Sequence, residues 1–350
     1  MKPDFKVIAN EQDITDLLRD RLLSLRITDK PGLESDDCEI EIDDRDGSVA
    51  FPEKGATLEI ILGYEGDVGL TFVGRFKVDE IEISGPPQRM LVRGKPADLV
   101  SSLKEQKRRS WENKTLDEIV GDIARDNQLQ PFCKLTPLVE RADQINESDM
   151  HFITRMARHY GATATVKDGK LIVVTRGDGK SGSGKDLPVI KLHRDDIASY
   201  SLSFPDRALY SEVRANYHNR ETGQLQTIIL PNQSAPGTAH APKHTDRHIH
   251  PTAAEATAAA ESRKNALNRA TMNGRIELMR GRADVCAEKM VELTGIKDEA
   301  DGTYLIESVE QNFSRNAWIT TIRINAGNEG KSGIGRGGAK NGNLKVLKIE

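Results

Sequence analysis

The sequence predicts a mainly β protein with an α+β insert, and three observations lead to this prediction. Short runs rich in β-branched residues recur in the first and last thirds of the chain. Turn-forming clusters, such as 30–32 (Lys-Pro-Gly) and 85–87 (Gly-Pro-Pro), separate these runs. Between the two strand-rich blocks, apolar residues recur at helical spacing instead. Because 350 residues exceed one typical core, two or three domains are expected.

The first block, residues 1–95, is predicted to form a barrel or sandwich of antiparallel strands. The candidate strands are 7–8, 22–27, 38–42, 57–62, 70–73, 76–83 and 90–92. The acidic stretch 43–47 (Asp-Asp-Arg-Asp-Gly) begins like a calcium loop, but the later ligands of an EF-hand, ending in a bidentate Glu, are missing. We therefore interpret this stretch as a turn.

The insert, residues 96–176, is predicted to be a small α+β domain. Pro96 is placed to open a helix that continues through Leu103. The spacing of Thr115 and Glu118 predicts a capping box at the start of a second helix, because apolar residues follow at helical spacing.

The most informative stretch of the insert is 144–174. Ser148 is a candidate N-cap, and Gly161 supplies a left-handed stop for the helix between them. One face of that helix is apolar, formed by Met150, Ile153, Met156, Ala157 and Tyr160. Asp168-Gly169 then predicts a hairpin between two β-prone runs. We expect the apolar face to pack on this hairpin.

The rest of the chain is predicted to hold a linker, a second strand-rich block and a tail. Residues 177–186 have the Gly/Ser composition of a flexible linker. In the block 187–326 the candidate strands are 188–192, 199–203, 210–217, 224–229, 275–279, 283–287, 304–309 and 318–324. The same block holds a Pro/His-rich loop, 231–251, and an Ala-rich helix, 252–273. The tail, 327–350, is Gly- and Lys-rich, and its end, 344–349, is a candidate strand or docking peptide.

Four motifs in a fixed order resemble the late control protein D family, the baseplate hubs of contractile-tailed phages and R-type pyocin-like particles. The motifs are Gly74 to Ile81 followed by Gly85-Pro86-Pro87; Lys107 to Trp111 leading into Thr115-Leu116; Gln144, Glu147, Ser148, Asp149, Phe152, Arg155, Ala157 and Gly161 before a hairpin; and Gly302 to Val309 followed by Phe313 and 318–321. No one motif is as specific as a paired CxxC, and the order makes the match strong. The resemblance spans about residues 7–324 and extends distantly to the VgrG hub of type VI secretion.

The resemblance implies a structural protein of a phage tail or tail-like particle, assembled in the host cytoplasm. It implies a homotrimer whose subunits each contribute two tube-like β-domains, giving a pseudo-six-fold ring between the six-fold tail tube and a three-fold spike. The implied partners are the tail spike, the tail tube, other baseplate proteins and the tape measure protein. No enzymatic activity and no cofactor are expected. The alternatives kept open are a hub-associated cell-wall hydrolase and a metal- or nucleic-acid-binding protein.

Two glycine-rich motifs partly match nucleotide-binding motifs. The stretch 179–185 nearly matches a P-loop, but Asp186 stands where the magnesium-binding hydroxyl is required, and Pro188 opposes the helix that should follow. Gly333, Gly335 and Gly338 fit GxGxxG without a βαβ unit around them. We therefore expect neither an ATP site nor a dinucleotide site.

Histidines crowd one segment of the second block and are the candidate metal ligands. They are His240, His244, His248 and His250, with Asp246 among them. Their spacing is not that of a helical HExxH motif, and prolines at 236, 242 and 251 oppose a helix. We favour a solvated polar loop and assign no metal.

Overall composition argues against nucleic-acid and membrane partners. The net charge is −4, the pI is near 6.1 and aromatic residues make up 5%. The basic run from Lys104 to Arg109 is interpreted as a solvated helix end. The spacing of the three cysteines predicts reduced thiols. The N-terminus has no apolar signal sequence, and no stretch has the length of a membrane span.

Overall fold

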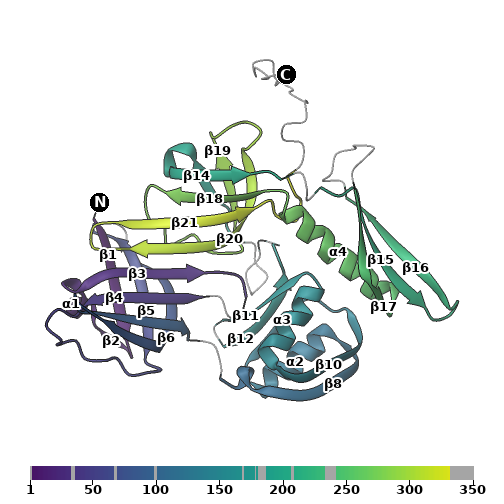
Figure 1. Ribbon diagram of the computed structural model, residues 1–350, viewed down its shortest axis with the longest axis horizontal. Coiled ribbons are helices and arrows are strands. Elements are labelled where there is room, and N and C mark those ends of the chain that lie inside the picture. The colour runs from purple at the N-terminus through teal and green to yellow at the C-terminus, as the bar shows by residue number, and fades with distance from the viewer. Residues whose placement is uncertain are drawn as a thin grey trace.

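The computed structural model describes residues 2–32, 36–66, 69–97, 101–167, 169–177, 179, 187–205, 209–232 and 242–331. Most of the predicted linker, His240, the GxGxxG stretch and the tail beyond Lys331 lie outside these residues. The described chain is mainly β, as predicted, with one 13-stranded sheet and three smaller sheets. Figure 1 shows the large sheet beside the insert, with a long helix and a three-stranded sheet at the far side.

The first block holds seven strands and a short helix. They are β1 (Pro3–Ala9), β2 (Gln12–Asp13), α1 (Thr15–Arg19), β3 (Leu22–Asp29), β4 (Asp37–Asp43), β5 (Thr57–Tyr64), β6 (Thr71–Ser84) and β7 (Arg89–Pro96). The two predicted strands 70–73 and 76–83 are one long strand, β6, which a β-bulge irregularity interrupts between Val78 and Glu80. The helix predicted to begin at Pro96 is wrong, because Pro96 ends β7 and pairs with Phe76. Its only helical remnant among the described residues is a 3-10 turn, Ser101–Lys104.

The insert has its own buried core between two helices and two small sheets. Its elements are β8 (Gln106–Thr115), α2 (Leu116–Asp126), β9 (Gln130–Cys133), β10 (Leu138–Ser148), α3 (Asp149–His159), β11 (Ala162–Lys167) and β12 (Lys170–Thr175). Trp111 stacks on Phe152 with ring centroids 4.6 Å apart. Lys104 ends the 3-10 turn, but Lys107, Arg108 and Arg109 belong to strand β8, which pairs antiparallel with β10.

The predicted caps, the helix stop and the apolar face of α3 are confirmed. The Ser148 hydroxyl accepts a hydrogen bond from the His151 backbone N–H at 3.2 Å, and Thr115 and Glu118 form the capping box. Gly161 has φ +67°, and a Cβ there would lie 3.3 Å from Ser262 of the second block. The apolar face of α3 is buried in the same core as Ala162 and Ala164 of the hairpin.

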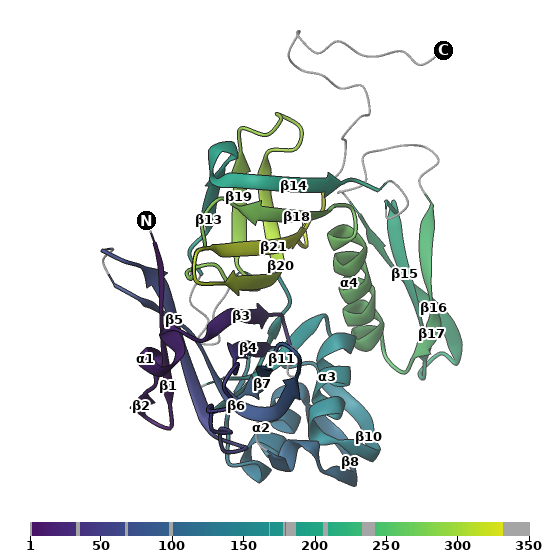
Figure 2. The ribbon, with the colours of Figure 1, turned by 60° about the vertical axis from the view of Figure 1, so that its left-hand side comes forward.

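The second block contributes the remaining elements. They are β13 (Ile190–His193), β14 (Ile197–Ser203), β15 (Glu212–Asn219), β16 (Gln224–Pro231), β17 (Lys243–His250), α4 (Ala253–Arg269), β18 (Asn273–Leu278), β19 (Met290–Thr294), β20 (Gly302–Phe313) and β21 (Trp318–Asn325). Figure 2 shows α4 lying along the sheet formed by β15, β16 and β17. Ala256, Ala260 and Leu267 of α4 are buried against this sheet.

Two sequence predictions for this block are wrong. Residues 283–287 are not a strand, and β19 follows them instead. The described part of the predicted Pro/His-rich loop contains β17, which pairs in parallel with β15. A parallel partner some 30 residues away in sequence is set by tertiary packing, and the proline and histidine content of the segment gave no sign of it.

The two strand-rich blocks join edge to edge. Strand β20 pairs antiparallel with β3, from Val309 opposite Asp29 to Phe313 opposite Leu25. The resulting strand order is β14-β18-β21-β20-β3-β4-β7-β6-β5-β1-β2. In the described residues neither block closes into a barrel, and the two blocks form one open sheet instead.

Candidate assembly surfaces

The junction between the blocks is held by a buried aromatic cluster. Trp318 and Phe313 of the second block lie in the core of the first block, where Phe5 meets Phe313 edge-on at 5.4 Å. Tyr64 lies 5.2 Å from the Trp318 ring, and its hydroxyl donates to the Gly281 carbonyl at 3.3 Å. These contacts fix how the two blocks sit relative to each other.

Polar groups at the junction are also paired. The Gln311 side-chain oxygen accepts hydrogen bonds from Trp318 Nε1 at 2.9 Å and from the Thr320 hydroxyl at 2.5 Å. Arg26 of β3 lies 3.2 Å from Glu310 of β20. The bonds of Gln311 lie within the second block and hold the Trp318 ring in place, whereas the Arg26–Glu310 pair crosses the β3–β20 seam.

The first block exposes an apolar groove. It has a volume of about 570 Å³ and is lined by Ala9, Ile14, Leu17, Leu18, Arg21, Ile40, Ile42, Ser48, Val49, Ala50, Phe51, Pro52, Ala56, Leu58, Met90 and Val92. Leu17 is 74% exposed and Phe51 is 63% exposed at its rim. Large apolar side chains grouped on a surface in this way mark a contact surface.

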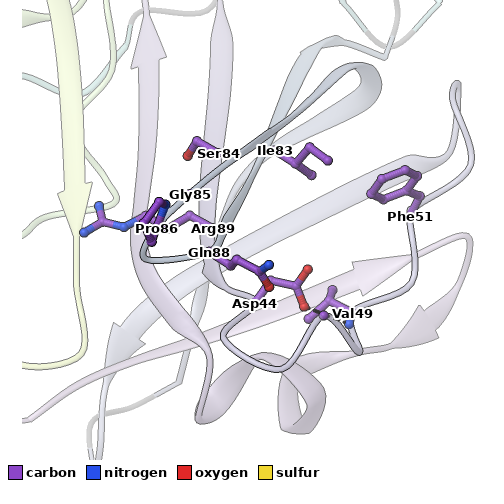
Figure 3. A pocket seen from close by; sticks show the side chains of 10 residues that line it. Asp44, Val49, Phe51, Ile83, Ser84, Gly85, Pro86, Gln88 and Arg89 are labelled. Carbon is purple, nitrogen blue, oxygen red and sulfur yellow. Dashed lines mark hydrogen bonds between the residues drawn. The ribbon is translucent and has the colours of Figure 1, made fainter.

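A second hollow shares Phe51 and Val49 with this groove. It has a volume of about 800 Å³ and includes the β6–β7 turn. Figure 3 shows Phe51 and Ile83 at one end of the hollow, with Pro86 and Arg89 at the other. Ile83 is 64% exposed. The lining mixes apolar, amide and charged groups.

The basic run of β8 is turned toward acidic groups of its own domain. Lys107 Nζ and Arg109 Nη2 lie 2.7 and 2.5 Å from the buried Asp149 carboxylate. Gln144 Nε2 and Asn127 Nδ2 donate to the same carboxylate at 3.0 and 2.9 Å. Burial by itself raises the pKa of Asp149, but the hydrogen bonds outweigh it and the pKa lies below its usual value. These two basic side chains therefore serve the insert's own structure rather than a phosphate backbone.

Among the described residues, the candidate metal ligands His244, His248 and His250 do not all converge, although the rings of His248 and His250 lie 4.9 Å apart. His240 lies outside the described residues. His244 Nε2 accepts a hydrogen bond from Arg263 at 3.0 Å, and burial followed by the Arg263 charge lowers its pKa. His248 is exposed. His250 is buried and lies 3.3 Å from Asp246.

His250 instead meets two residues that the sequence did not single out. His159, the last residue of α3, and Glu255, in the first turn of α4, have ligand atoms within 4.8 Å of each other and of His250. Burial, then the nearby His250 and His248, lowers the pKa of His159, while burial and Glu140 raise the pKa of Glu255. The three side chains come from separate elements, so no spacing rule could have found them.

Comparison with known proteins identifies the family. The model of the phage tail baseplate hub (GPD) family matches residues 88–317. This chain belongs to that family. The probable baseplate hub proteins of Escherichia phages 186 and P2 are 32% and 30% identical to it, over 93% of this chain and 93% of each relative. Members of the family are components of the phage tail baseplate, so the sequence resemblance is confirmed.

Solved structures share the fold. The 43 kDa tail protein of prophage MuSo2 from Shewanella oneidensis superposes with a TM-score of 0.67 at 14% identity, covering 93% of this chain and 99% of that one. The Francisella PdpA–VgrG complex matches with a TM-score of 0.54 at 11% identity, covering 93% of this chain and 57% of that one. These neighbours show the fold, whereas the family and the curated relatives favour a structural baseplate protein over the hydrolase and metal-binding alternatives.

The described helices hold no candidate membrane span, since none is both long enough and apolar enough. The three cysteines are free thiols, Cys38 buried and the other two partly buried. Burial raises the pKa of Cys38 to about 12, so this thiol stays protonated.

Proposed function

We propose that this baseplate hub acts as a homotrimer that adapts the six-fold tail tube to a three-fold spike. The observation that carries the proposal is the β3–β20 junction, which makes the two strand-rich blocks one rigid sheet. Three chains with two such blocks each present six blocks around an axis, which fits a six-fold tube on one side and a trimeric spike on the other.

The division of the chain belongs to the same proposal. It consists of tube-like domains at 1–95 and 187–326, an α+β insert at 96–176, a linker at 177–186 and a tail at 327–350. Separate buried cores in the first block, the insert and the second block support this division. Because β3 of the first block pairs with β20 of the second, the two proposed β-domains form one continuous sheet.

The proposed action is mechanical. The hub transmits sheath contraction to the spike through buried interfaces and turns over no substrate. The lining of the larger hollows, which offers no catalytic arrangement, supports a structural role. The tail spike, tail tube, other baseplate proteins and tape measure protein are the proposed partners.

The apolar groove with Leu17 and Phe51 supports self-association, and we assign it to contact with a second copy of the chain. A surface this apolar is costly to leave in water. The test is the native mass of the purified protein, alone and with the adjacent spike protein. We expect a trimer that binds one spike trimer. A stable dimer at every concentration would contradict the proposal.

A further inference from the structure

We propose a divalent transition-metal site formed by His159, His250 and Glu255. The bound ion would connect the insert to the outer sheet of the second block, which is the sheet formed by β15, β16 and β17. The three residues come from the end of α3, the end of β17 and the first turn of α4. Two imidazoles and one carboxylate are the donor set of known zinc sites that keep a position for water. The site lies within one chain, so it does not depend on the trimer.

The state of His250 provides an independent reason to expect a ligand. Its side chain is 2% exposed, and its Nδ1 atom is buried without a hydrogen-bond partner. A buried polar atom without a partner is costly. A metal ion would use the lone pair of Nδ1 and remove that cost.

The other nitrogen of His250 is already oriented. Nε2 lies 3.3 Å from an Asp246 carboxylate oxygen, and Asp246 also accepts a hydrogen bond from the His248 backbone N–H at 3.1 Å. A carboxylate that accepts the Nε2 proton leaves Nδ1 as the metal-binding nitrogen. Metal-bound histidines commonly have such a carboxylate behind them.

The spacing needs only small adjustments. The three ligand atoms lie within 4.8 Å of one another. A tetrahedral ion with arms of about 2.1 Å requires ligand atoms about 3.4 Å apart, so side-chain rotations of about 1 Å close the site. Glu255 is anchored for this, because its backbone N–H donates to the Thr252 hydroxyl at 3.2 Å.

The site would strengthen a contact in which Ala258 of α4 packs on the core of the insert and polar groups surround it. The Ser262 hydroxyl of α4 donates to the Arg158 carbonyl at 3.2 Å, and Arg220 pairs with Glu140 at 2.5 Å across the same contact. Exposed pairs of this kind stabilise little. A bound ion that joins α3 to β17 and α4 would resist separation of the insert from the outer sheet.

The test titrates ZnCl₂ into the metal-stripped full-length protein and follows binding by calorimetry. We expect about one zinc per chain and a Tm rise of about 3–5 °C at saturating zinc. The variants His159→Gln, His250→Gln and Glu255→Gln should each weaken zinc binding more than about 100-fold, and Asp246→Asn by about 10–100-fold. Cobalt in place of zinc should give the visible absorption of a tetrahedral site.

Two matched controls remove a histidine elsewhere. His218→Ala removes an exposed imidazole of β15. His244→Ala removes one of the candidate metal ligands that the sequence indicated. Both should bind zinc like the parent. Circular dichroism reports folding separately, so a loss of zinc binding supports the site when the variant remains folded. Equal binding by parent and ligand variants, loss only in His244→Ala, or no stoichiometric binding by the folded parent would overturn the proposal.

Discussion

Adding one methyl group at Gly281 should destabilise the junction between the two blocks. A Cβ built at Gly281 would lie 2.0 Å from Trp318 Cδ2 and 2.2 Å from Trp318 Cγ, far inside contact distance. The Trp318 ring has little room to move, because Trp318 is 5% exposed, its Nε1 donates a hydrogen bond to Gln311 and its ring contacts Tyr64. The Gly281→Ala variant must therefore shift the ring or its own loop.

The magnitude follows from these contacts. Overpacking costs about 1–3 kcal/mol, and a strained or lost hydrogen bond from Trp318 or Tyr64 adds about 1 kcal/mol. The reduced entropy of the unfolded chain offsets up to about 1 kcal/mol. The free energy of unfolding should fall by about 2–3 kcal/mol.

Urea denaturation followed by tryptophan fluorescence measures this change. Gly121→Ala is the matched control, because a Cβ at this α2 position meets only Arg125 Nη2 at 3.9 Å. Alanine favours a helix, so the control should be neutral or stabilising. In a Trp318→Leu background, Gly281→Ala should cost much less, because the obstructing ring is gone. Equal stability of Gly281→Ala and the parent would refute the reasoning.

Three further predictions concern the insert and the groove. Asp149→Asn should lower the free energy of unfolding by about 3 kcal/mol at pH 7, since Lys107 and Arg109 lose their partner. Because the pKa of Asp149 is lowered on folding, its contribution is complete above the unfolded pKa of about 3.9 and disappears as pH falls through the folded pKa. The difference in stability between parent and variant should therefore narrow as pH falls below about 3.9, and a gap that stays constant there would count against the network. Ile153→Asp should cost about 4 kcal/mol, because Ile153 is 1% exposed; an unchanged Tm would show that this face is not buried. Phe51→Asp should leave the monomer folded but reduce trimer formation by light scattering, while the exposed Leu225→Asp on β16 should not; a normal trimer in Phe51→Asp would remove the groove from the interface.

Local signals carried the predictions for the insert. The N-cap at Ser148, the stop at Gly161 and the hairpin at Gly169 involve residues only a few positions apart, so the sequence alone determines them. Strand existence was also predicted where alternation was clear, as in β3, β4 and β5. The order of the four motifs was enough to identify the baseplate hub family.

Long-range pairing decided what the sequence could not. The charges of strand β8 were interpreted as a helix end because their shared partner, Asp149, lies some 40 residues away in sequence. Strand β17 needs β15 as a parallel partner, and His250 meets His159 and Glu255 only when α3, β17 and α4 pack together. The continuous sheet depends on β3 and β20, which are nearly 300 residues apart. Sequence periodicity indicates which face of a strand is buried. The backbone groups at the edge of a strand are the same in every strand, so they do not identify its partner. Only the tertiary structure could therefore decide which strands pair.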